Sequence, residues 1–328
     1  MTAMAATAGA GAGSEAGHKR AGAVSVATAL LVAAFLAVGS LGAYRYVLNF
    51  WLYRGFPAPR DPAFVKVAGT EQQLQLRSAA LGGRRQLVDV YLPPGYAQDV
   101  NRRYPVFYLL HGFPGRPAAF LSTVKLGVDE DVLVNQGRIR PVILVMPFGS
   151  TGTFTDKEWA DGIGAHEGWE TFVARDVVRA IDARYRTIPN ASARAIGGLS
   201  EGGYGAVNIA LHHPREFRVV ESWSGYELAD GISSIYGGRQ ALIRYNSPLV
   251  RLRAVAAALR RDHAYFWFYS GSTESPSFRK QNAKFAGELA RARIPHRFFI
   301  INGGHNWAVW RANGSTALQV AATRLQHG

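Results

Sequence analysis

Residues 193–206, ARAIGGLSEGGYGA, constrain the fold of this chain more than any other stretch. A short apolar run leads into Gly198-Leu-Ser200-Glu-Gly202, and a helix-compatible run follows as far as His213. This order predicts a strand, a sharp turn with a serine at its apex, and a helix, as in a Gly-x-Ser-x-Gly elbow. Glycines flank the serine because side chains there would clash with the neighbouring strand and helix. The helix N-terminus would direct N–H groups towards a developing anion.

Strand-like and helix-like segments alternate from about Phe64 onwards. The continuous apolar runs VFYLL (106–110) and VILVM (142–146) predict strands that are buried on both faces. The expected strands are 72–77, 86–92, 106–110, 142–146, the elbow strand, 218–223, 264–269 and 297–301. Helices are expected over 171–185, after the elbow, and over 251–261, 277–293 and 315–325. This pattern predicts an α/β fold in which helices flank a mostly parallel sheet of about eight strands.

An apolar segment without charged side chains runs from Ala21 to Tyr44. As a helix it would be about 36 Å long, enough to cross a bilayer, and a buried soluble helix of this length would usually have a polar face. We therefore expect a disordered tail (1–20), a transmembrane helix or signal anchor (21–44), a juxtamembrane linker (45–63) and one catalytic domain (64–328). Lys19 and Arg20 favour a cytoplasmic N-terminus, although Arg45 and Arg54 oppose it. The predicted location is the cell membrane, with a single span and the domain outside the cytoplasm; cleavage and secretion are the alternative.

Composition excludes several kinds of chemistry. The chain has no cysteine, so disulfides, thiol catalysis and cysteine metal sites are impossible. Its net charge is +14, but the arginine pairs are scattered and no nucleic-acid-binding module is recognisable, so no nucleic-acid partner is expected. The histidines lack a metal-ligand spacing, and no phosphate loop or dinucleotide fingerprint is present. We predict no cofactor and no metal.

Three polar side chains follow the ends of predicted strands, where active sites of open α/β sheets lie. They are Ser200, Glu274 and His305, in the order serine, acid, histidine. Serine is a poor nucleophile that needs a base; the histidine could take its proton, and the acid could orient the imidazole. Asp230 and Asp262 are alternative acids. The backbone N–H groups of Phe113 and Glu201 are candidate oxyanion donors, whereas His111 is expected to be structural.

The same segments resemble the esterase D-like family of α/β-hydrolases, which includes S-formylglutathione hydrolases, feruloyl esterases, enterochelin esterases and mycolyltransferases. The matching pieces lie between about Gln72 and Arg311 and include YPVFYLLHGFPG (104–115), AIGGLSEGGYGA (195–206), YSGSTE (269–274) and GGHNWAVWR (303–311). The resemblance implies a nucleophile, acid and base at Ser200, Glu274 and His305, and oxyanion donors at Phe113 and Glu201.

Two residues depart from the family pattern. Glu201 stands where methionine is common, and Glu274 stands where aspartate is more common than glutamate. A carboxylate at position 201 could repel anionic acyl groups or attract cationic ones such as an aminoacyl ester.

The favoured function is therefore a membrane-anchored serine esterase that hydrolyses a small-molecule or lipid acyl ester through an acyl-enzyme. An acyltransferase that passes the acyl group to a sugar or lipid hydroxyl is the alternative. A non-catalytic module that binds the cell envelope is a third interpretation.

Overall fold

The computed structural model describes residues 13–54, 58–65, 67–152 and 154–326. The chain divides into two units, residues 1–55 and 56–328, which are described separately. Residues 1–12 of the expected N-terminal tail lie outside the described residues.

The first unit is a single helix, α1 (Gly13–Tyr53), of 41 residues. It is longer than the expected 21–44 span and continues through residues 45–53, where a linker is predicted; the first proline of the chain is Pro57. Its segment Ser25–Val47 has a mean hydropathy of 2.2 and is long and apolar enough to cross a membrane. None of that segment is buried within the structure, although a signal sequence can have the same character.

The second unit is built on one eight-stranded sheet with the order β1-β2-β4-β3-β5-β6-β7-β8. The first two pairings, β1 with β2 and β2 with β4, are antiparallel, and all others are parallel. The strands are β1 (Thr70–Arg77), β2 (Arg85–Leu92), β3 (Val106–Leu110), β4 (Ile143–Pro147), β5 (Arg194–Leu199), β6 (Val219–Trp223), β7 (Tyr265–Gly271) and β8 (His296–Ile301). The prediction of an α/β fold with about eight mostly parallel strands is confirmed.

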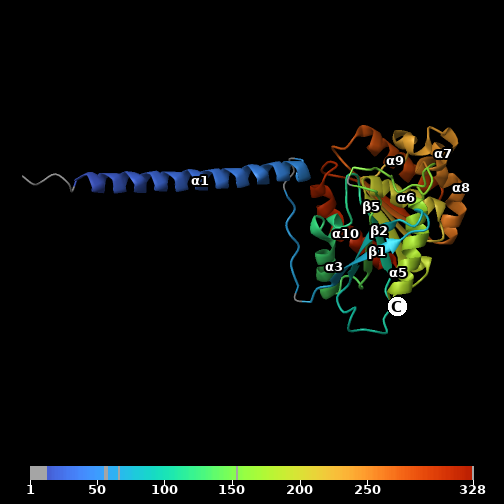
Figure 1. Ribbon diagram of the computed structural model, residues 1–328. Coiled ribbons are helices and arrows are strands. Elements are labelled where there is room, and N and C mark those ends of the chain that lie inside the picture. The colour runs from blue at the N-terminus through green and yellow to red at the C-terminus, as the bar shows by residue number, and fades with distance from the viewer. Residues whose placement is uncertain (1–12, 55–57, 66, 153, 327–328) are drawn as a thin grey trace, which may run out of the picture. The chain divides into compact units, whose positions relative to one another are not determined.

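Helices cover both faces of this sheet. They are α2 (Ala119–Ser122), α3 (Leu126–Asn135), α4 (Trp169–Thr171), the π-helical turn η1 (Phe172–Val177), α5 (Val178–Arg184), η2 (Ala191–Ala193), α6 (Glu201–His212), η3 (Asp230–Tyr236), α7 (Gln240–Tyr245), α8 (Pro248–Arg261), α9 (Pro276–Arg291) and α10 (Trp307–Arg324). Helices α3 and α10 lie on one side of the sheet, and α5, α6, α8 and α9 lie on the other (Figure 1).

Alternation along β3 explains why it reads as a continuous apolar run. Val106, Tyr108 and Leu110 belong to the core shared with α5, α6, α8 and α9. Phe107 and Leu109 belong to the core shared with α3 and α10. Because successive side chains point to opposite faces, a central strand covered on both sides must be apolar at every position.

Several helices begin earlier than expected, among them α8, which begins at Pro248 instead of residue 251. Helix α9 begins at Pro276 instead of residue 277, because the Ser275 hydroxyl accepts a hydrogen bond from the Ser277 N–H and so caps the helix. Helix α10 begins at Trp307 instead of Ser315, since the Asn306 side chain accepts the Val309 N–H and caps it there. This earlier start places the helix directly after His305.

Candidate active site

Ser200 sits at the apex of the turn between β5 and α6 with φ 58° and ψ −121°. This backbone conformation is costly for a residue with a side chain and persists only when neighbouring groups hold it. The Ser200 N–H donates to the Trp223 carbonyl at 2.9 Å, and the Ser200 carbonyl accepts from the Gly203 N–H at 2.9 Å. The turn therefore exposes the hydroxyl at the carboxyl edge of the sheet.

The two glycines of the elbow are required by close backbone approach. A Cβ at Gly202 would lie 1.9 Å from the Leu110 carbonyl oxygen, and one at Gly198 would lie 2.4 Å from the Gly202 carbonyl oxygen. Such distances are far inside van der Waals contact. The predicted steric reason for Gly-x-Ser-x-Gly is thus visible between β3, β5 and α6.

His305 lies beside the serine, in the loop between β8 and α10. Its Nε2 atom is 2.7 Å from the Ser200 Oγ atom. The imidazole packs edge-on against the Trp310 ring at 5.1 Å and against the Phe278 ring at 6.2 Å, measured between centroids. These aromatic rings restrict the orientation of the imidazole.

Glu274 lies on the other side of the imidazole. Its Oε1 atom is 3.4 Å from His305 Nδ1, and its side chain is fully buried. Hydrogen bonds join the loop that carries Glu274 to the loop that carries His305. The Thr273 N–H donates to the Gly303 carbonyl, and the Gly303 N–H donates to Ser272 Oγ. The structure thus brings the three predicted side chains together from the ends of three strands.

The alternative acids lie elsewhere. Asp262 follows α8, with its Oδ1 atom 3.9 Å from Arg261 Nε, and Asp230 lines a cavity together with Glu158 and Tyr226. Among the described residues, Glu274 provides the one carboxyl group within 4 Å of a His305 nitrogen.

The loop after β3 approaches the serine from the opposite side. A Cβ at Gly112 would lie 3.0 Å from the Ser200 Cβ, so this backbone borders the nucleophile directly. Within the described part of the chain, no acceptor engages the backbone N–H of Phe113 or of Glu201. Because an oxyanion site needs unpaired N–H groups, Phe113 and Glu201 stay the candidate donors.

His111 supports this loop. The Gly149 N–H donates to its Nε2 atom at 3.1 Å, which places the ring proton on Nδ1, where it can donate to the Gly112 carbonyl at 2.9 Å. Burial of the ring lowers the pKa of His111 to about 4. The imidazole is therefore neutral and structural, as expected.

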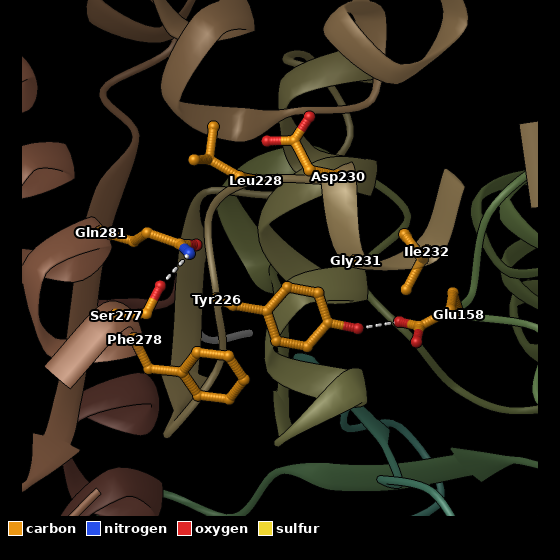
Figure 2. Close-up of a pocket in the computed structure, with 9 residues that line it drawn as sticks. All are labelled: Glu158, Tyr226, Leu228, Asp230, Gly231, Ile232, Ser277, Phe278 and Gln281. Atoms are coloured by element: carbon orange, nitrogen blue, oxygen red, sulfur yellow. Dashed lines mark hydrogen bonds between the residues drawn. The ribbon is translucent and has the colours of Figure 1, made fainter. Parts of the chain in front are cut away.

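A cavity of about 520 Å³ adjoins the site (Figure 2). It is lined by Glu158, Tyr226, Leu228, Asp230, Gly231, Ile232, Ser277, Phe278 and Gln281. The Tyr226 hydroxyl donates to the Glu158 carboxylate, and Phe278 joins the cavity to His305. Sequence reasoning missed Glu158 and Tyr226, because nothing in their spacing links a loop acid to a residue beyond β6.

Comparisons with known proteins agree with the fold and the motifs. The Esterase family model matches residues 78–318, more than half of the chain. An endo-1,4-beta-xylanase/feruloyl esterase of Xylanibacter ruminicola is 34% identical over 152 residues, which cover 45% of this chain and 20% of that protein. Esterase Rv1288 of Mycobacterium tuberculosis is 28% identical over 247 residues, covering 66% of this chain and 52% of that protein. The chain thus spans at most about half the length of these two relatives.

Solved structures share the fold at lower identity. A ferulic acid esterase superposes with a TM-score of 0.69 at 23% identity, covering 79% of this chain and all of that one. An S-formylglutathione hydrolase from Staphylococcus aureus gives a TM-score of 0.64 at 17% identity, covering 77% of this chain and 99% of that one. These matches confirm the predicted esterase D-like resemblance. The chain belongs to the Esterase family and has its α/β-hydrolase fold.

Proposed function

We propose that this protein is a serine esterase that hydrolyses a carboxylic ester through an acyl-enzyme. The observation that carries the proposal is the 2.7 Å separation between His305 Nε2 and Ser200 Oγ, with the buried Glu274 carboxyl group behind the imidazole. A base in hydrogen-bond contact with the hydroxyl and an acid that orients the base are the parts that serine activation requires.

The reaction follows from these positions. As Ser200 Oγ attacks the carbonyl carbon of the ester, His305 Nε2 takes the hydroxyl proton and Glu274 stabilises the imidazolium. The carbonyl oxygen becomes an oxyanion, which the N–H groups of Phe113 and Glu201 bind. When the ester C–O bond breaks, the imidazolium returns the proton to the leaving alcohol. Water then attacks the acyl-enzyme, loses a proton to His305 and releases the acid and Ser200.

Helix α1 is proposed to attach the enzyme to the cell membrane, with residues 56–328 outside the cytoplasm. From Ser25 to Val47 its apolar side chains are exposed on every face, including Leu31 at 71% and Phe35 at 78%. A helix that is apolar on every face requires an apolar environment, which a bilayer supplies. The segment Ser25–Val47 is long enough to span it.

Activity-based labelling tests the proposal. The full-length protein, purified in detergent, is expected to react with a fluorophosphonate, and mass spectrometry should place the adduct on Ser200. The Ser200→Ala variant should lose both labelling and hydrolysis of short 4-nitrophenyl esters while keeping the wild-type circular dichroism spectrum. Ester hydrolysis that persists in this variant would refute the assignment. Product analysis with excess alcohol or sugar separates hydrolysis from acyl transfer.

A further inference from the structure

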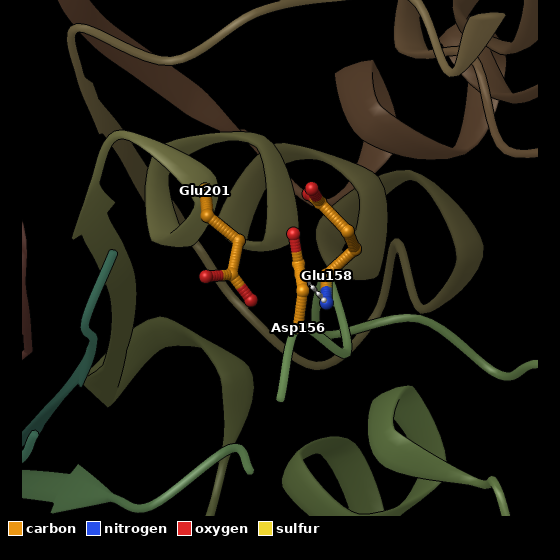
Figure 3. Close-up of side chains that lie close together, drawn as sticks. All are labelled: Asp156, Glu158 and Glu201. Carbon is orange, nitrogen blue, oxygen red and sulfur yellow. Dashed lines mark hydrogen bonds between the residues drawn. The ribbon is translucent and has the colours of Figure 1, made fainter. Parts of the chain in front are cut away.

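Three carboxyl groups gather next to the proposed nucleophile. One oxygen each of Asp156, Glu158 and Glu201 can be chosen so that all lie within 4.8 Å of one another. Figure 3 shows Glu201 extending from the start of α6 towards Asp156, with Glu158 beside it. The three residues come from two separate parts of the chain, so only the fold brings them together.

Holding these three carboxyl groups together without a bound cation costs folding free energy. Glu158 is 5% exposed and Glu201 is 4% exposed, whereas Asp156 lies at the surface. Across the described ranges, no lysine or arginine forms an ion pair with any of the three, although the chain carries a net charge of +14. Burial raises the pKa of all three carboxyl groups, and mutual repulsion adds to the shifts of Glu158 and Glu201. A cation bound among them would relieve this repulsion.

One member of the cluster, Glu158, also lines the cavity beside the proposed nucleophile. Glu201 follows Ser200 in the sequence, and the backbone N–H of Glu201 is a proposed oxyanion donor. Glu158 lines the 520 Å³ cavity together with Tyr226 and Phe278, and the Phe278 ring packs against His305. An acyl group whose carbonyl carbon faces Ser200 therefore has beside it a cavity that Glu158 lines. Asp156 and Glu201 lie next to Glu158, and we call these three residues the acidic wall.

We propose that this acidic wall binds an ammonium group carried by the acyl part of the substrate, so that the ester cleaved is an aminoacyl ester. The proposal rests on the esterase function proposed above. A primary ammonium has three N–H donors, which matches three carboxyl groups as acceptors. Glu201, Glu158 and Asp156 are then specificity-determining residues.

The test compares esters that differ only in charge. L-alanine benzyl ester is matched with benzyl isobutyrate, in which a methyl group replaces the ammonium, and benzyl ε-aminocaproate is matched with benzyl heptanoate. In full-length protein, kcat/KM for the charged member of at least one pair should exceed that of its neutral partner by about tenfold or more, the size of one charge-assisted hydrogen bond. In Glu158→Gln and Glu201→Gln this ratio should fall towards one. The exposed Glu71, changed to Gln, is the control and should keep the wild-type ratio.

The ratio separates the two proposals. Ser200-dependent hydrolysis with no preference for either charged ester overturns the aminoacyl proposal alone. Failure to hydrolyse any of the four esters, together with no fluorophosphonate labelling, overturns the esterase function itself. Tight calcium binding that Glu158→Gln abolishes would make the cluster a metal site and would also overturn the aminoacyl proposal. If one variant fails to fold, kcat/KM falls for both esters of a pair in that variant. The ratio of kcat/KM values is then measured in the other variant.

Discussion

The carboxyl group of Glu274 is fully buried, and its Oε1 atom lies 3.4 Å from Nδ1 of His305. Its second oxygen, Oε2, has no hydrogen-bond partner among the described residues. A buried carboxylate with one free oxygen beside an imidazole is stabilised most when that imidazole becomes positively charged. This arrangement explains how a proton transfer from Ser200 could be assisted.

Replacing Glu274 by Gln should therefore lower kcat by about 10⁴-fold with little effect on stability, as expected when a triad acid loses its charge. Steady-state kinetics on a 4-nitrophenyl ester measures the change. Asp262→Asn, which removes an alternative acid far from His305, is the control and should retain wild-type kinetics. The acid is misassigned if Asp262→Asn is the variant that loses activity.

Gly202→Ala should destabilise the second unit by at least about 2 kcal/mol, because the new methyl group would overlap the Leu110 carbonyl oxygen. Urea unfolding followed by tryptophan fluorescence measures the loss. Gly287 in α9 is the matched control: the nearest atom to a Cβ there is 4.0 Å away, so Gly287→Ala should stabilise the protein by about 0.5–1 kcal/mol. Equal effects at both sites would contradict the steric argument.

Acid should destabilise the protein through His111. Its pKa is about 4 in the folded state against 6.5 when unperturbed, so the unfolded chain binds more protons between these values. The free energy of unfolding should therefore fall as pH decreases from about 6.5 to 4, by up to about 1.4 kcal/mol per pH unit. In urea titrations at several pH values, the His111→Asn variant should show a smaller dependence of the free energy of unfolding on pH. The variant should also be less stable than wild type at pH 7. An unchanged slope would mean that other groups dominate.

Alkali should destabilise the protein through Glu158. Burial and the neighbouring Asp156 raise the pKa of Glu158 from 4.5 to about 8, so the folded state holds a proton that the unfolded chain releases. The free energy of unfolding should fall as pH rises from about 4.5 to 8. The groups facing Glu158 are Asp156, Glu201 and Tyr226, and the Glu158→Gln variant keeps an acceptor for the Tyr226 hydroxyl. This variant should be more stable than wild type at pH 8, with a smaller pH slope.

Helix α1 should hold the protein in the membrane. After cell lysis, full-length protein should stay in the membrane pellet through sodium carbonate washing and leave it only in detergent. Introducing two arginines near the middle, as Leu31→Arg and Phe35→Arg, should prevent stable insertion, because each charge is costly there. Release of wild-type protein by carbonate would contradict a spanning helix.

Local sequence was sufficient for the eight strands and for the order of the proposed catalytic residues. The apolar run of β3 required a doubly covered strand, and Gly198 and Gly202 required an elbow, because these signals depend on neighbouring residues alone. Strand ends in a parallel sheet meet at one edge, so the positions of Ser200, Glu274 and His305 just after three strands are enough to predict that they lie together. Glu201, next to the nucleophile, led to the expectation of a site that discriminates by charge, and this stays a prediction.

Tertiary structure alone decided the rest. Asp156 and Glu158 lie in a loop more than forty residues before Glu201, and no periodicity relates a loop carboxyl to a helix N-terminus. The start of α10 at Trp307 depends on the Asn306 side chain, a capping signal that hydrophobic periodicity does not reveal. Whether a buried carboxyl group is neutralised depends on which cations the fold brings near it. These cations come from residues distant in the sequence. The acidic wall can therefore be recognised only in the folded protein.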